Sequence, residues 1–582
     1  MHPLNSPNKQ TRPGRLCLGA LFCLFALVPP AGAGESRREK PVKYDPAGLP
    51  QRYQITIDID YRAASFTGHE VVRFVNSNRT EVDSVSFHLY PNVGLGEDAE
   101  PWLALERVSS GERELKFSLK SRGTLVRVQL PAKLAPGQSL ELRLEFSGRV
   151  PKVQREETSL LAHFLQEVND AVSDERLQRD ARDMFFASEQ AMLLGYFYPM
   201  LATRAALSTE QGLAAGVSGI VLSDVADYDV TVRVDDGLTV ISSAEGQGRK
   251  ITAPTEAAAK NRSEYVFRGE RLRGFAIALG EKLQSVEKRV GQTRVVSYFR
   301  EGDERLGQQM LGVAVGAVET YNKAFGEYPY PLLSVVEVPL TAGYSGIEFP
   351  GLAALAQAYY IDFNAPEAKR LPDLLREQAD VIKSAIEFTL AHCVAHQWWG
   401  GVVGSDPQRN PWLDEALANY AAAYYYEAVY GRAAGDEAIE RQLRGVYHAY
   451  RMLGGTDQEV DKPAKDFHSF IQYSAIVQAK GALMLAGLRR RLGDEQFFNT
   501  LRYYYSNRKF QIASPHHLRY AMLASAEDHQ VIRDLFQRWL KEKHGDEDIG
   551  VPEMALFTPQ GSKKRSLGRF FGRIGRAAAR PF

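Results

Sequence analysis

Two histidines four residues apart, His392 and His396, constrain the fold of this chain more than any other feature. A helix places both of these imidazoles on one side. A carboxylate follows nineteen positions after the second histidine, at Glu415, early in a predicted helix that begins at Pro411. Two imidazoles and a carboxylate form a three-ligand set that suits zinc and leaves a fourth position open. Histidines at this spacing also serve packing alone, so it is the carboxylate that favours a metal site.

The N-terminus has the pattern of an export signal. Basic residues precede an apolar run from 16 to 28, which ends in small residues that suit cleavage after Ala33. The run is too short to span a bilayer comfortably, and an uncleaved anchor is the alternative. We therefore expect a signal peptide over 1–33, a linker over 34–50, and a protein exported to the periplasm or the extracellular space.

Charge balance, cysteine count and hydropathy limit the partners and the structural features that we expect. Basic and acidic residues are equal in number, 71 of each among 582, so charge gives no support for a nucleic-acid partner. Signal cleavage removes Cys17 and Cys23 and leaves Cys393 as the one thiol, which excludes an intrachain disulfide. No later stretch of sequence is apolar enough to predict a membrane helix.

The hydrophobic pattern changes along the chain from period two to period 3.6. From Tyr53, isoleucines alternate with polar residues, and further runs of this kind between turn residues predict a largely antiparallel β domain over 51–285. Helices dominate beyond about residue 372, so we expect a mostly helical domain over 286–545. The fold class predicted is multidomain α+β.

A β-hairpin is expected at Asp235-Asp236-Gly237. Strands are predicted on both sides of this turn, over 228–234 and 238–242. Because Asp-Gly is a favoured hairpin turn, we expect these two strands to pair.

The chain ends in a basic segment over residues 546–582, with its cations between Lys563 and Arg580. A solvated, disordered tail is one interpretation. Apolar residues among the cations could form one face of a helix, so contact of 563–580 with an anionic surface is the alternative.

The sequence around the metal ligands resembles the gluzincin aminopeptidase family, which includes alanyl aminopeptidases and leukotriene hydrolase. The family pattern is H-E-x-x-H-x(18)-E, with W-W-G or W-F-G after the second His and W-L-N-E-G around the Glu. Here His396 precedes Gln397-Trp398-Trp399-Gly400, and Glu415 stands in Trp412-Leu413-Asp414-Glu415-Ala416. The resemblance covers residues 53–539. It implies a saddle-like N-terminal β domain, a thermolysin-like domain with one Zn²⁺ on His392, His396 and Glu415, and peptides or protein N-termini as ligands.

A second family signature lies upstream of the metal motif. Gly346-Ile347-Glu348-Phe349 resembles G-x-M-E-N, which in the family is an edge strand along the substrate groove. The resemblance implies that Gly346 and Glu348 bind substrate, with the Glu348 carboxylate on the free α-amine in a charge-assisted contact. A solvated edge residue is the alternative for Glu348.

Two positions depart from the family pattern where its catalytic groups stand. Cys393 occupies the place of the general-base glutamate, whose contribution to rate is typically about 10²–10⁴-fold. The family's Y-E-K-G corresponds to Gln478-Ala479-Lys480-Gly481, so Gln478 occupies the place of the tyrosine that stabilises the oxyanion. A glutamine amide can donate a hydrogen bond there. Tyr473 is about 140° away round an α-helix, and without a register shift it is expected to be a poor substitute for that tyrosine.

Three functions are consistent with this pattern. The first is an exported zinc-binding protein with a groove for peptide N-termini and impaired peptidase activity. The alternative is an active aminopeptidase that uses zinc-bound hydroxide to remove N-terminal residues. In the third, zinc only stabilises the helical core, and another surface such as the basic tail carries the function.

Overall fold

The computed structural model describes residues 51–96, 98–172, 180–203, 217–251, 262–371, 373–377 and 379–550. The predicted signal peptide and linker, and the basic residues 563–580, lie outside these ranges. The described residues fall in one compact unit that begins at Leu49.

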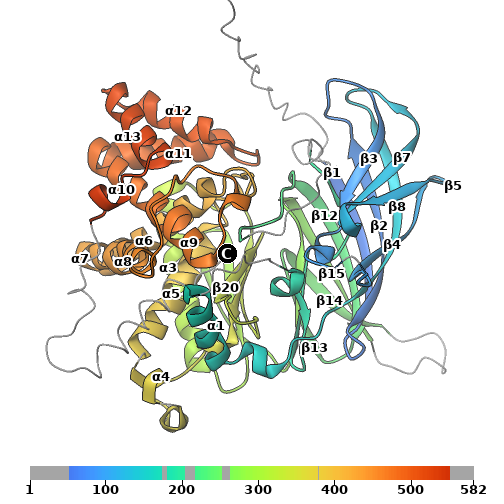
Figure 1. The fold of residues 1–582 in the computed structure, drawn as a ribbon. Helices are drawn as coiled ribbons and strands as arrows, with labels where there is room; N and C mark the ends of the chain where they lie inside the picture. Colours follow the sequence, from blue (N-terminus) through green and yellow to red (C-terminus); the bar gives the residue numbers. More distant parts are fainter. Residues whose placement is uncertain are drawn as a thin grey trace, which may run out of the picture. The chain divides into compact units, whose positions relative to one another are not determined.

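The first half of the described chain is built on an eight-stranded sheet (Figure 1). Its strand order is β14 (Glu245–Ile251), β15 (Arg262–Leu272), β12 (Ala226–Asp235), β1 (Gln51–Asp60), β2 (Ser65–Val75), β8 (Ser139–Arg149), β4 (Leu103–Ser110) and β5 (Arg113–Glu114). Apart from the parallel β1–β12 pair, its ladders are antiparallel. Burial alternates along β1 as its sequence predicts, with Tyr53, Ile55 and Ile57 facing the core.

Two four-stranded sheets accompany the large one. One has the order β13 (Leu238–Ser242), β16 (Ala276–Glu281), β10 (Ala191–Gly195), β9 (Phe185–Ala187), and the other β11 (Met200–Leu201), β3 (Val82–His88), β7 (Leu125–Leu134), β6 (Phe117–Lys120). The predicted hairpin at residues 235–237 is wrong, because β12 and β13 belong to different sheets. Both edges of β12 are already occupied, by β1 and β15, so β13 pairs with β16 instead.

A five-stranded sheet begins the second half of the chain. Its order is β17 (Gln284–Val290), β18 (Thr293–Phe299), β19 (Leu332–Val338), β21 (Leu352–Ala356) and β20 (Gly346–Phe349). Strands β18, β19 and β21 are parallel, and β20 is antiparallel at the edge. The long helix α3 (Glu304–Phe325) connects β18 to β19. The sheet starts next to the domain boundary predicted at residue 285, which stays a prediction.

Helices make up most of the chain after this sheet (Figure 1). They are α4 (Asp373–Glu377), α5 (Ala379–Ala395), α6 (Trp412–Tyr430), α7 (Arg432–Ala438), α8 (Gly445–Met452), α9 (Phe470–Tyr473), α10 (Gly481–Leu492), α11 (Asp494–Arg508), α12 (Pro515–Ser525), α13 (His529–Lys541) and α14 (Gly545–Asp548). Two π-helical segments, Ile439–Arg444 and Ser474–Lys480, interrupt the series. The order of sheets and then helices confirms the predicted α+β class. None of the helices in the described ranges is long and apolar enough to cross a membrane.

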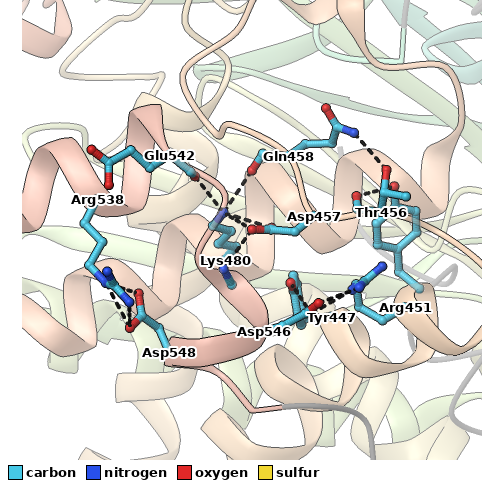
Figure 2. A network of polar contacts seen from close by, with 12 residues as sticks. Tyr447, Arg451, Thr456, Asp457, Gln458, Lys480, Arg538, Glu542, Asp546 and Asp548 are labelled. Carbon is cyan, nitrogen blue, oxygen red and sulfur yellow. Dashed lines mark hydrogen bonds and ion pairs between the residues drawn. The ribbon is translucent and has the colours of Figure 1, made fainter.

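The folded chain extends past the predicted start of the basic tail at residue 546. Helix α14 lies across that boundary, and Asp546 and Asp548 form ion pairs with Arg451 and Arg538 (Figure 2). These acidic residues hold the segment against α8 and α13, and the extent of the tail stays a prediction.

Candidate metal centre and substrate groove

Helices α5 and α6 carry the three predicted metal ligands. His392 lies in the last turn of α5, His396 follows directly after its end, and Glu415 lies in the first turn of α6. The C-terminal part of α5, from Phe388 onward, is buried, so α5 presents its histidines to the interior and not to solvent. All three side chains are almost fully buried, at 0%, 6% and 5% exposed.

The ligand atoms of these residues meet at one point. His392 Nε2 and His396 Nε2 are 2.9 Å apart, and Glu415 Oε2 is 3.7 Å from each of them. Among the described residues this is the one group of three or more metal-ligating side chains whose ligand atoms lie within 4.8 Å of one another. The predicted ligands are therefore brought together.

The hydrogen bonds at the Nδ1 atoms of the two histidines determine whether their Nε2 atoms can act as metal ligands. His396 Nδ1 lies 2.9 Å from the Trp399 carbonyl, which can only accept, so this nitrogen carries a proton. His392 Nδ1 lies 3.1 Å from Asn419 Oδ1, one helical turn beyond Glu415. In their neutral form both rings therefore direct an Nε2 lone pair at the other. Such an arrangement, with a carboxylate beside it, fits a bound cation.

The electrostatic field at this point also favours a cation. Burial disfavours a charged imidazole at His396, yet the carboxylates of Glu348 and Glu415 outweigh it and raise its pKa to about 10. Asp414 adds a further carboxyl group, which accepts a 2.6 Å hydrogen bond from Ser405 Oγ. Burial raises the pKa of Asp414 to about 6, although His396 opposes the shift.

Strand β20 runs beside α5 at the level of Cys393. A Cβ atom at Gly346 would lie only 2.7 Å from Thr389 Cγ2 and 3.1 Å from Cys393 Sγ, so glycine permits this close approach. Two residues further along the strand lies Glu348, and its carboxylate charge acts on the Cys393 thiol. The residue in the general-base position therefore lies beside the strand that carries the residue expected to bind the substrate amine.

Cys393 stands apart from the metal ligands. Its sulfur is absent from the group formed by His392, His396 and Glu415, and its side chain is fully buried. Burial and the charge of Glu348 raise the pKa of the thiol well above its ordinary value.

Gln478 and Tyr473 both reach Glu415. Gln478 Nε2 donates to Glu415 Oε2 at 2.9 Å, and the Tyr473 hydroxyl donates to Oε1 at 3.4 Å. The shift in helical register that Tyr473 needs in order to reach the site is present. Residues 474–480 form a π-helix, whose wider turn brings residues five apart to the same side.

Close packing and a buried ion pair hold this π-helix in place (Figure 2). A Cβ atom at Gly481 would lie 2.8 Å from the Ala416 Cβ, so glycine lets α10 approach α6 just after the metal ligand. Lys480 is 1% exposed and its ammonium lies 2.8 Å from Asp457. It also donates to the Gln458 and Glu542 carbonyls, at 2.9 and 3.3 Å.

Sequence reasoning missed the residues that support the site. Asn419 could have been found, because it lies four positions after Glu415 on the same helical face. Gln397 could not, because its partners are distant in sequence. Its Nε2 donates to the Phe349 carbonyl at 3.0 Å, and its Oε1 accepts from Gly351 N at 2.8 Å and from the Tyr328 hydroxyl at 3.2 Å. The Gln397 amide thus fastens the β20–β21 turn to the metal motif.

A hollow of about 130 Å³ lies over the metal ligands. Glu348, His396 and Glu415 line it together, so the expected amine-binding group and two metal ligands face one space. Residues from the loops of the N-terminal half complete the wall, among them Met184, Tyr196, Ile220 and Arg273.

Fold and site together define a zinc metallopeptidase-type protein with one Zn²⁺ site. Known proteins share this fold. Residues 310–539 match the peptidase family M1 domain. The M1 zinc metallopeptidase of Deinococcus radiodurans superposes with a TM-score of 0.54 over 84% of this chain and 93% of that one, at 16% identity. A mutant form of it bound to a Tyr-Ser-Ala substrate gives the same score over 85% and 94%.

Sequence relatives agree with this fold. Aminopeptidase N of Lactobacillus delbrueckii subsp. lactis is 28% identical over 46% of this chain and 30% of its own length. Aminopeptidase 2 of Candida albicans is 22% identical over 86% of this chain and 47% of its own. The chain thus spans about a third to a half of the length of these curated relatives. The M1 domain match over residues 310–539, the aminopeptidase relatives and the M1 structural neighbours support the gluzincin aminopeptidase family for this chain.

Proposed function

We propose that this protein binds the N-termini of peptides at its zinc site and hydrolyses them poorly. A complete set of metal ligands, with a buried thiol outside it at the general-base position, is the observation that carries this proposal. His392, His396 and Glu415 come together, whereas Cys393 lies outside their group and offers no carboxylate.

The groove supports recognition of a free α-amine. Glu348 lies on an edge strand, in the same hollow as His396 and Glu415. A carboxylate there would pair with the α-ammonium group of a peptide whose first carbonyl lies near the metal. A zinc ion supplies Lewis-acid polarisation of a carbonyl oxygen when it is bound. His392, His396 and Glu415 would hold it.

The same geometry supports impaired hydrolysis. A general base must come within hydrogen-bond reach of the proton that it abstracts. Cys393 has a short, fully buried side chain that lies outside the ligand group. Gln478 directs an N–H group at Glu415, where it supports the ligand. No carboxylate occupies the general-base position, and no phenol occupies the position of the family tyrosine.

Turnover of aminoacyl fluorogenic substrates tests this proposal. Wild type is expected near background, and Cys393→Glu combined with Gln478→Tyr should raise zinc-dependent turnover by about 10²-fold or more. Adding His396→Ala to that double variant should abolish the gain. Zinc-dependent turnover by the wild type that matches the double variant and is lost in His396→Ala would overturn the proposal.

Peptide binding is the second arm of the test. A labelled peptide with a free N-terminus should bind the zinc-loaded protein at least about tenfold more tightly than its N-acetylated form. Glu348→Gln should remove that difference. Equal affinity for the two peptides would contradict an amine-binding role for Glu348.

Residual aminopeptidase activity is the second candidate, and the position of Tyr473 favours it. The π-helix brings the Tyr473 hydroxyl to the Glu415 carboxylate, within the metal site. A phenol in that place can donate a hydrogen bond to a developing oxyanion. Under this proposal any wild-type turnover is lost in Tyr473→Phe while zinc content stays unchanged.

We also propose that the protein is exported to the periplasm or the extracellular space. This proposal rests on the signal-like sequence before Ala33. N-terminal sequencing of the protein recovered from the periplasm or the medium should begin at Gly34, and a chain that keeps its first residues inside the cell would contradict export.

A further inference from the structure

A second and larger cleft lies apart from the metal site. It has a volume of about 990 Å³ and is lined by β1, β12 and β15 together with residues 329–332 and 509–510. It shares no lining residue with the hollow over the metal ligands. The two cavities are therefore separate, and the second has its own set of polar groups.

Two cations meet over one aromatic ring at an end of this cleft. Arg271 Cζ lies 5.1 Å and Lys509 Nζ 5.3 Å from the centroid of the Phe510 ring. Among the described residues neither cationic group has an ion-pair partner, and Glu327 is the one acid whose charge reaches Lys509. The other cations of the cleft, Arg52 and Arg268, are paired with Asp229.

The positive charges of Arg271 and Lys509 repel each other. Burial and the nearby Arg271 charge lower the pKa of Lys509, whereas Glu327 raises it less. Two like charges on one ring are stabilised when an anion lies between them. Arg271 offers a planar donor fork that matches carboxylate or phosphate oxygens, and Lys509 offers a compact charge. The acids that line the cleft include Asp227 and Glu270, and Asp227 Oδ1 accepts a 3.0 Å hydrogen bond from the Arg271 backbone N.

Backbone strain marks the same place. Arg271 and Phe510 have φ of 54° and 65°, in the left-handed region that non-glycine residues avoid. Hydrogen bonds hold both strained residues: the Tyr330 hydroxyl donates to the Arg271 carbonyl at 2.7 Å, and Phe510 N donates to the Val402 carbonyl at 2.7 Å. Residues kept in such conformations cluster at ligand sites, where the surrounding structure maintains them.

We propose that Arg271, Lys509 and Phe510 form a binding site for an oxyanion, a carboxylate or a phosphate group. The guanidinium and ammonium groups bind the oxyanion, and the face of Phe510 keeps the two cations oriented toward it. The site is independent of the proposed amine-binding groove, because none of the three residues lines the hollow over the metal.

Calorimetric titration of the zinc-loaded protein tests this proposal. The probes are inorganic phosphate, an N-acetylated Asp-Glu dipeptide, and the N-acetylated Asn-Gln dipeptide amide as the neutral control, all at one ionic strength. Acetylation removes the α-amine, so Glu348 cannot contribute. Phosphate, the acidic dipeptide or both should bind, and the neutral dipeptide should not. Which of the two binds identifies the source of the oxyanion.

Variants assign the binding to this end of the cleft. Arg271→Gln combined with Lys509→Gln should weaken binding by about 100-fold, roughly tenfold for each charge-assisted contact. Arg268→Gln, which removes a paired cation of the same cleft, should change it less than about threefold. Equal loss in Arg268→Gln, equal binding of the neutral dipeptide, or absence of binding by both anionic probes would overturn the proposal.

A measurement on the wild type keeps the proposal testable if the double variant fails to fold. Ligands that bind the native state raise the melting temperature. The anionic probe that binds should therefore raise the wild-type Tm above its value in chloride at equal ionic strength. An unchanged Tm would overturn the site.

Discussion

Tyr473 and Gln478 are five residues apart, yet both donate hydrogen bonds to the carboxylate of Glu415. On an α-helix their side chains would point about 140° apart. The π-helical segment Ser474–Lys480 removes most of that difference. Each oxygen of the metal-ligating carboxylate is thereby held by a different side chain.

Loss of these outer contacts should weaken zinc binding. Gln478→Leu removes the 2.9 Å donor to Glu415 Oε2, and we expect zinc affinity to fall about 10- to 100-fold. Tyr473→Phe should cost less, because its contact with Oε1 is 3.4 Å long. Competition with a chromophoric chelator measures both effects. Tyr503→Phe on α11, at an exposed position, is the matched control. Unchanged affinity in Gln478→Leu would show that Glu415 needs no such support.

The metal ligands and the order of sheets and helices could be predicted because both depend on local spacing. His392 and His396 follow helical periodicity, and β1 alternates at period two. The π-helix has no comparable pattern of polar and apolar residues in the sequence. All seven residues from Ser474 to Lys480 are buried, so no polar face reveals which residues share a side.

Tertiary contacts explain what else the sequence could not show. The Asp235-Asp236-Gly237 turn suits a hairpin, but pairing depends on whether the edge of β12 is open, and β15 and β1 occupy both edges. The cluster of Arg271 with Lys509 joins residues far apart in sequence. Neither residue belongs to a motif, so only the folded chain brings them together.

Replacement of Gln397 should weaken peptide binding without releasing zinc. Gln397→Leu removes the bonds to the Phe349 carbonyl and Gly351 N, which position the strand that carries Glu348. If the protein binds peptide N-termini as proposed, affinity for a free-amine peptide should fall about tenfold. Zinc content, measured by metal analysis, should stay at the wild-type level.

A conservative variant separates this positioning role from a general loss of packing. Gln397→Glu keeps an acceptor for Gly351 N but places a second oxygen against the Phe349 carbonyl. It should therefore weaken peptide binding about as much as Gln397→Leu. Zinc loss in parallel with peptide affinity would instead assign Gln397 to the metal site.

Removing one partner of the buried Lys480–Asp457 ion pair should destabilise the protein strongly (Figure 2). Lys480→Met leaves the Asp457 carboxylate 7% exposed and without its cation, so unfolding in urea should require about 3–5 kcal/mol less. Lys541→Met is the control, because the Lys541–Asp461 pair is half exposed on the lysine side and should contribute about 1 kcal/mol or less. Equal effects of the two variants would contradict the role of burial.

Glu70 should make the protein less stable as pH rises. It lies on β2 at 1% exposure, and among the described residues neither of its carboxyl oxygens has a hydrogen-bond partner. Burial raises its pKa well above the ordinary 4.5, so the folded protein keeps the proton that the unfolded chain releases. Stability from Glu70 is thus complete below about pH 4.5 and is lost as pH rises toward the folded-state pKa, at about 1.4 kcal/mol per unit.

Glu70→Gln isolates this effect from the other titrating groups. Glutamine has nearly the same shape and no ionisable proton, so the variant should gain stability over wild type as pH increases from 5 to 8. Urea unfolding at several pH values measures the difference. Glu141→Gln on the neighbouring strand β8, with an exposed side chain, should give a difference near zero throughout. A wild-type and Glu70→Gln pair whose stabilities differ by a constant amount at every pH would show that Glu70 is ionised in the folded protein.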